Sequence, residues 1–193
     1  MSVSADLIGR GVSIQDDFLS PGRVQDLLEC LEARRARGDF APARIGAGRS
    51  LQRREDIRGD SICWMNPPLL AAEARLLESF EELRLQLNRE AFLGLFELEL
   101  HYAAYPAGSG YERHIDQPRG NNRRKVSVVL YLNREWTEGV GGELRIFAET
   151  GQSMDVQPLA GRLVCFLTEA REHCVLPARR ERLSITGWFG TRD

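Results

Sequence analysis

Several features that would point to a specialised class of protein are missing from this sequence. Its 193 residues carry a net charge of −2, so no basic excess draws the chain to nucleic acid or to an anionic membrane. No apolar run approaches the length that crosses a bilayer, and the N-terminus lacks the basic-then-apolar pattern of a signal peptide. There is no internal repeat and no low-complexity segment. We therefore expect an ordinary globular protein with neither nucleic-acid nor membrane partners.

Cysteine and histidine are scarce as well. The four cysteines lie far apart and include no Cys-x-x-Cys pair, which argues against a thiolate zinc site or a dithiol redox motif. Scattered thiols without a signal peptide are typical of a reducing compartment, so we expect the protein in the cytoplasm. The three histidines are His101, His114 and His173.

Residues 1–92 predict supporting helices more than a core of their own. Ser20 can cap a helix that has Pro21 at its first position, and apolar residues follow at helical spacing. Arg34 belongs to a cluster of arginines at the end of this helix, where we expect solvated cations. A second helix is expected from about residue 66 to residue 88.

The second helix has a well-charged polar face, which includes Glu73, and we expect this helix to be part of the scaffold and not of the site. Between the two helices, residues 44–60 form a long, charged, glycine-containing loop. A loop of this length is more often functional than passive, so we expect it to cover a substrate.

Residues 93–193 have a different sequence pattern, because short strand-like runs alternate there with turn residues. The runs are FELELHYAAY, SGYERHID, RKVSVVLYLN, GGELRIFA, SMDVQPL, GRLVCFLT, EHCVLPA and RLSITGWFG. Short strands at such close spacing predict a sandwich, barrel or jelly roll. We therefore expect one domain of the α+β class, mainly β, in which residues 93–193 form the core.

A histidine and an aspartate two residues apart stand out in this region. Alternate residues of a strand point to the same side, so His114 and Asp116 can offer an imidazole and a carboxylate to one point. Such a pair by itself is weak evidence for a metal site. His173 lies 57 residues after Asp116, on another expected strand that could face the first across the mouth of the barrel. Two imidazoles and one carboxylate are the ligand set of non-haem Fe(II) oxygenases.

An arginine follows at a fixed distance from the last of these residues. Arg182 comes nine residues after His173 and begins an alternating strand, in which Thr186 and Trp188 share its face. A guanidinium group in this place could make a two-pronged contact with a carboxylate.

With these motifs the sequence resembles the Fe(II)- and 2-oxoglutarate-dependent oxygenases. The resemblance is closest to the prolyl hydroxylases that act on hypoxia-inducible factor and to their bacterial counterparts. The segments that carry it are EDIRGDSICW (55–64), YPAGSGYERHID (105–116), VLYLNREW (129–136), GGELRIF (141–147) and RLSITGW (182–188). The resemblance implies a double-stranded β-helix, the jelly roll of this family, as the core.

The resemblance also implies roles for individual residues. His114, Asp116 and His173 would bind Fe(II). Arg182 and Tyr131 would hold the far carboxylate of 2-oxoglutarate. The remaining residues expected around the co-substrate and the metal are Tyr105, Thr186 and Trp188. O2 would be the further co-substrate, and the resemblance is compatible with ascorbate as an additional cofactor. The products would be succinate, CO2 and a hydroxylated substrate.

On the substrate side, the resemblance implies a protein or peptide that contains proline. A translation factor such as elongation factor Tu is the target that the bacterial members suggest. We expect substrate contacts from Arg58, Asp60 and Tyr111. His101 shares a face with Tyr105, so it either contacts the substrate or is an interior histidine with its hydrogen bonds satisfied; the second interpretation is favoured.

Three alternatives remain open. The same site could hydroxylate a free amino acid or a small metabolite. A metal-binding sensor without turnover would need neither the complete ligand set nor Arg182. A zinc hydrolase would need a general base beside the metal and has no use for Arg182 and Tyr131.

Overall fold

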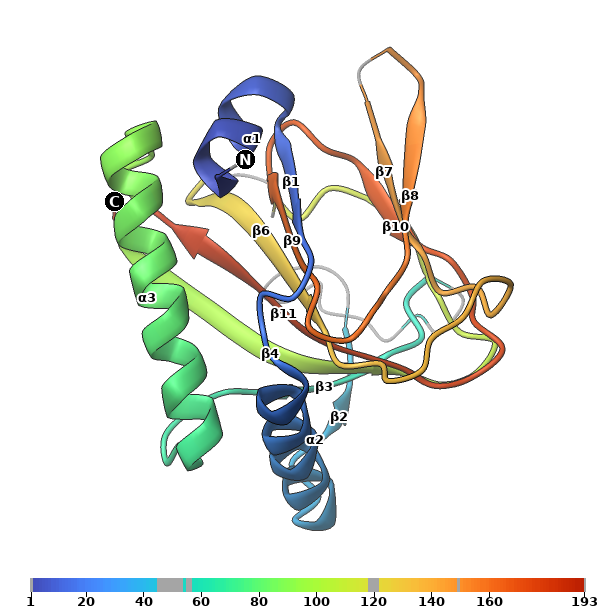
Figure 1. Ribbon diagram of the computed structural model, residues 1–193. Coiled ribbons are helices and arrows are strands. Elements are labelled where there is room, and N and C mark those ends of the chain that lie inside the picture. The colour runs from blue at the N-terminus through green and yellow to red at the C-terminus, as the bar shows by residue number, and fades with distance from the viewer. Residues whose placement is uncertain (1, 45–53, 55–56, 118–121, 149, 193) are drawn as a thin grey trace.

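In the computed structural model, the described residues form two antiparallel β-sheets that face each other and three helices that cover the outer face of the larger sheet (Figure 1). The structure describes residues 2–44, 54, 57–117, 122–148 and 150–192. Most of the expected covering loop, namely residues 45–53 and 55–56, lies outside the described residues.

Within the described part of the chain, the larger sheet has seven strands in the order β1-β9-β6-β11-β4-β3-β2, and the smaller has four in the order β5-β10-β7-β8. The strands of the larger sheet are β1 (Val12–Gln15), β2 (Ala41–Pro42), β3 (Ser61–Trp64), β4 (Glu97–Tyr105), β6 (Arg124–Tyr131), β9 (Leu163–Leu167) and β11 (Arg182–Gly190). The strands of the smaller sheet are β5 (Tyr111–His114), β7 (Leu144–Phe147), β8 (Ser153–Val156) and β10 (His173–Val175).

The eight strand-like segments predicted after residue 92 are all strands, and the mainly β, jelly-roll class is confirmed. The N-terminal part of the chain contributes to the sheet as well as to its support. Its strands β1, β2 and β3 extend the larger sheet at its two edges.

The helices are α1 (Val3–Arg10), α2 (Pro21–Ala36) and α3 (Ala71–Ala91). The predicted start of α2 is confirmed, because the Ser20 side chain accepts a hydrogen bond from a backbone N–H of the first turn. The predicted start of α3 near residue 66 is wrong. Residues before a proline avoid the helical conformation, and Leu70 is still extended; its N–H donates to the Glu73 carboxylate at 2.8 Å.

A buried ion pair joins α2 to α3, against the expectation of solvated charges. Arg34 Nε and Nη2 donate to the two carboxylate oxygens of Glu73 at 3.2 and 2.8 Å, and Glu73 is 0% exposed. Arg34 Nη2 also donates to the carbonyl of Pro68. The prediction of a solvated helix end is wrong for Arg34, because α2 and α3 pack together at this point and bury Arg34 and Glu73 alone among their charged residues.

Alternate residues of β4, in the larger sheet, belong to two separate apolar layers. Leu100 and Tyr102 of β4 pack with the helices, whereas Ala103 and Tyr105 pack between the two sheets. The polar residues described below lie in the layer between the sheets. In the part of the chain that the structure describes, no helix is both long and apolar enough to cross a membrane.

Candidate active site

The pairing of two strands in the smaller sheet brings two histidines together. His114 ends β5, His173 begins β10, and the two are direct partners in the antiparallel register. Their ring centroids are 4.2 Å apart. The expectation that these histidines face each other across the barrel mouth is therefore wrong, since they are neighbours in one sheet.

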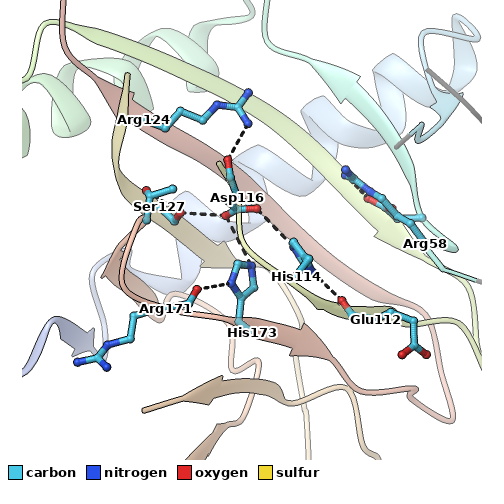
Figure 2. A network of polar contacts seen from close by, with 10 residues as sticks. Arg58, Glu112, His114, Asp116, Arg124, Ser127, Arg171 and His173 are labelled. Carbon is cyan, nitrogen blue, oxygen red and sulfur yellow. Dashed lines mark hydrogen bonds and ion pairs between the residues drawn. The ribbon is translucent and has the colours of Figure 1, made fainter. Parts of the chain in front are cut away.

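Asp116 completes the group from beyond the end of β5. Its convergence with His114 therefore comes from the bend after the strand and not from the predicted alternation along a strand. Asp116 Oδ1 lies 3.4 Å from His114 Nε2, and Asp116 Oδ2 lies 3.6 Å from His173 Nε2 (Figure 2). The three residues offer ligand atoms that all lie within 4.8 Å of one another.

Two further side chains hold Asp116 in place. Ser127 Oγ donates to Asp116 Oδ2 at 2.9 Å, and Arg124 Nη1 donates to the Asp116 carbonyl oxygen at 3.3 Å (Figure 2). Sequence reasoning missed both residues. The available signal for Ser127 was a small polar residue in the apolar run VSVVL.

Backbone carbonyls fix the orientation of both imidazoles. His114 Nδ1 lies 2.7 Å from the carbonyl oxygen of Glu112, and His173 Nδ1 lies 3.2 Å from that of Arg171. A carbonyl oxygen only accepts, so each Nδ1 carries a proton, and each ring turns its Nε2 toward Asp116. Metal-binding histidines are held in the same way.

The charges of the group also suit a metal. Burial alone would raise the pKa of Asp116, but the His173 and His114 imidazoles hold it well below its usual range. Burial lowers the pKa of the His173 imidazole, although Asp116 opposes this shift. One carboxylate and two imidazoles converge here, and this donor set fits Fe(II).

A pocket between the sheets begins at this group. Its lining residues are Arg58, Asp60, His101, Ala103, Tyr105, Tyr111, His114, Asp116, Val129, Leu144, His173, Val175, Arg182, Thr186 and Trp188. The lining includes every site residue predicted from the sequence except Tyr131. Thr186 and Trp188 follow Arg182 along β11, as the alternation predicts.

Arg182 forms the inner wall of the pocket and is 1% exposed. Its Nε donates to the Gly142 carbonyl at 2.8 Å, and its guanidinium lies 5.3 and 5.0 Å from the ring centroids of Tyr105 and Tyr131. Arg182 Nη2 and the Tyr131 hydroxyl have no hydrogen-bond partner among the described residues. Because buried polar groups are normally paired, these two donors define a place for a carboxylate, which fits 2-oxoglutarate.

The opposite wall comes from the described end of the expected covering loop. Glu112 N–H donates to the Ile57 carbonyl at 2.9 Å, which ties the loop end to β5. Arg58 makes a two-pronged ion pair with Asp60, at 2.7 and 3.0 Å, and its guanidinium lies over the Tyr111 ring. Tyr111 in turn stacks on His114, with centroids 3.5 Å apart.

Comparisons with known proteins agree with this fold and site. The profile of the 2OG-Fe(II) oxygenase superfamily matches residues 100–190. Human Egl nine homolog 1 is 34% identical over 193 residues, which cover 95% of this chain and 44% of the human protein. A Pseudomonas putida prolyl-4-hydroxylase structure is 44% identical, with a TM-score of 0.90 over 99% of this chain and 98% of the other.

A prolyl hydroxylase from Trichoplax adhaerens, solved with a hypoxia-inducible factor peptide, is 27% identical. Its TM-score is 0.85 over 97% of this chain and 87% of that one. The chain belongs to the 2OG-Fe(II) oxygenase superfamily, and the relatives that it matches include prolyl hydroxylases. It spans less than half the length of the human relative.

Proposed function

We propose that the protein hydroxylates a prolyl residue of a protein or peptide with Fe(II), 2-oxoglutarate and O2, and releases succinate and CO2. The observation that carries the proposal is the convergence, in one pocket, of a three-residue metal group and a buried arginine with an unpaired donor. A hydrolase or a sensor has no use for the arginine.

The proposed roles follow from the geometry. His114, Asp116 and His173 hold the iron, and Arg182 with Tyr131 holds the far carboxylate of 2-oxoglutarate. When bound, the iron and the co-substrate supply the oxidising chemistry that converts a C–H bond into C–OH. The protein orients both groups, and the apolar layer between the sheets keeps water away from them.

Three residues of the opposite wall are proposed to contact the substrate, namely Arg58, Asp60 and Tyr111. Arg58 and Asp60 neutralise each other, so this wall accepts an uncharged prolyl segment without leaving a buried charge unpaired. A peptide is the favoured substrate because the relative from Trichoplax adhaerens was solved with one. Elongation factor Tu is the proposed target in a bacterial cytoplasm.

The test is a mass-spectrometric search for one added oxygen on proline. The protein is incubated with Fe(II), 2-oxoglutarate and O2, together with elongation factor Tu, the hypoxia-inducible factor peptide or a cytosolic extract. We expect modified proline and an equal amount of succinate, and neither without iron or with the His173→Ala variant.

Other results would redirect the assignment. Succinate formed with free amino acids, without any modified peptide, would favour the small-molecule hydroxylase. A protein that binds metal but releases no succinate with any of these additions would be a sensor. If other proteins of the extract are hydroxylated and elongation factor Tu is not, elongation factor Tu is ruled out as the target, and the proposed prolyl hydroxylation stands.

A further inference from the structure

His101 lies in the pocket and has no role in the assignment above. It belongs to β4, is 1% exposed and lines the pocket. Neither of its ring nitrogens has a hydrogen-bond partner among the described residues, so the expectation of an interior histidine with satisfied hydrogen bonds is wrong. Buried polar atoms are normally paired, so an unpaired imidazole in the lining of a pocket is suited to a ligand.

The surroundings of His101 keep its imidazole neutral and fixed. Burial lowers the pKa of His101 to about 3, and the cation of Arg58 adds to the shift. The ring packs with Trp64 and Trp188, at centroid distances of 4.8 and 5.4 Å. Trp64 is 41% exposed, so this aromatic cluster reaches from the surface into the pocket.

The two arginines on the same side of the pocket already have acceptors. Arg58 is paired with Asp60, and Arg124 donates to Glu99 and to the Asp116 carbonyl. The Trp188 indole N–H, like the ring nitrogens of His101, has no hydrogen-bond partner among the described residues. His101 and Trp188 therefore supply the donors on this side that are left for a ligand, and His101 has no role in the assignment above.

A prolyl segment needs a donor of this kind. Proline has no backbone N–H, so the chain around it presents carbonyl oxygens without the usual complement of donors. A neutral imidazole supplies one N–H and is too weakly basic here to become charged. We propose that His101 is a substrate-positioning residue, whose ring N–H donates to a backbone carbonyl of the prolyl substrate. This inference rests on the proposed function and specifies a polar contact for its substrate.

Two substitutions separate this role from simple packing. His101→Leu keeps an apolar side chain of similar size and removes both nitrogens, whereas His101→Gln restores an N–H donor. Tyr102→Phe is the matched control, because it removes a buried hydroxyl from the next residue of β4, which packs with the helices on the other face of the sheet.

Binding is measured without turnover, with Mn(II) and N-oxalylglycine in place of Fe(II) and 2-oxoglutarate. The probes are elongation factor Tu and the hypoxia-inducible factor peptide, and tryptophan fluorescence reports on Trp64 and Trp188. For the better probe we expect Kd and KM to rise about three- to ten-fold in His101→Leu, the scale of one neutral hydrogen bond. His101→Gln should recover most of this loss, and Tyr102→Phe should bind like the wild type.

Activity assays add two readouts that packing alone would not move. In His101→Leu, more succinate should form per hydroxyproline because the proline is held less well, while the KM for 2-oxoglutarate should not change. Wild-type Kd in His101→Leu, or an effect only on 2-oxoglutarate, would overturn the inference. If the wild type binds a probe but does not hydroxylate it, the proposed function is overturned, and the Kd values of the His101 variants alone decide the role of His101. If the wild type neither binds nor hydroxylates a probe, both the proposed function and the role of His101 are overturned.

Discussion

Replacing Arg182 by lysine tests the co-substrate anchor most directly. Lysine keeps the positive charge but lacks the planar fork, so it cannot reproduce both the contact with the Gly142 carbonyl and a donor at the position of Nη2. A hydrogen bond to a charged group contributes about 1.5–3 kcal/mol. At about 1.4 kcal/mol per factor of ten, the loss of one raises the 2-oxoglutarate requirement roughly 10- to 100-fold.

The measurement is the KM for 2-oxoglutarate from succinate release, together with its Kd in the presence of Mn(II). Arg145→Lys is the matched control. Arg145 is a half-exposed arginine of β7 that pairs with Asp155 of β8 at 2.7 Å, and it lies outside the pocket lining. Tyr131→Phe should weaken 2-oxoglutarate binding in the same direction. Since both side chains are proposed to hold one carboxylate, their effects should be less than additive in the double variant.

A folded Arg182→Lys variant with the wild-type KM and Kd for 2-oxoglutarate would refute this reasoning. The unpaired Nη2 would then have a structural cause, and the co-substrate would be anchored elsewhere. Thermal unfolding of each variant separates that result from a general loss of structure.

The other predictions concern the metal group and the stability of the fold. His173→Ala should abolish metal binding and succinate release, because two remaining ligands do not hold a facial site; metal analysis after dialysis checks this. Ser127→Ala should weaken metal affinity by about 10- to 100-fold, as seen when a partner of a metal ligand is lost, and metal titration measures it. Glu73→Ala should lower the free energy of unfolding by up to about 3–5 kcal/mol, because the buried Arg34 keeps only the Pro68 carbonyl and the Asp39 carboxylate, at 3.6 Å, as partners. The exposed Glu82→Ala should change it little in urea melts. Because burial lowers the pKa of His101 from 6.5 to about 3, the unfolded chain takes up this proton first as the pH falls. The free energy of unfolding should therefore drop between pH 6.5 and 3, by up to about 1.4 kcal/mol per pH unit from this group, and less steeply in His101→Leu.

The strands and the pocket residues could be predicted because their signals are local. Alternation of apolar residues between turn residues marks each strand of the jelly roll, and it places Thr186 and Trp188 on the face of Arg182. The capped start of α2 is equally local, since Ser20 and Pro21 are adjacent in the sequence.

The features that sequence reasoning missed depend on contacts between distant segments. Arg34 and Glu73 are buried because α2 and α3 pack together at these residues. The periodicity within either helix does not predict that contact. The adjacency of His114 and His173 follows from the register of β5 with β10. The roles of Arg124 and Ser127 likewise appear only when the bend at Asp116 folds back onto β6.

The direct pairing of His114 with His173 makes the metal group a check on the register of the sheet. Side chains alternate between faces, so a slip of β10 by one residue would bring Cys174 beside His114 and turn His173 away. Such a group would combine a thiolate with an imidazole and a carboxylate, a softer set that favours zinc over iron. The identity of the metal retained by the purified protein would thus report whether β5 and β10 had paired in the native register.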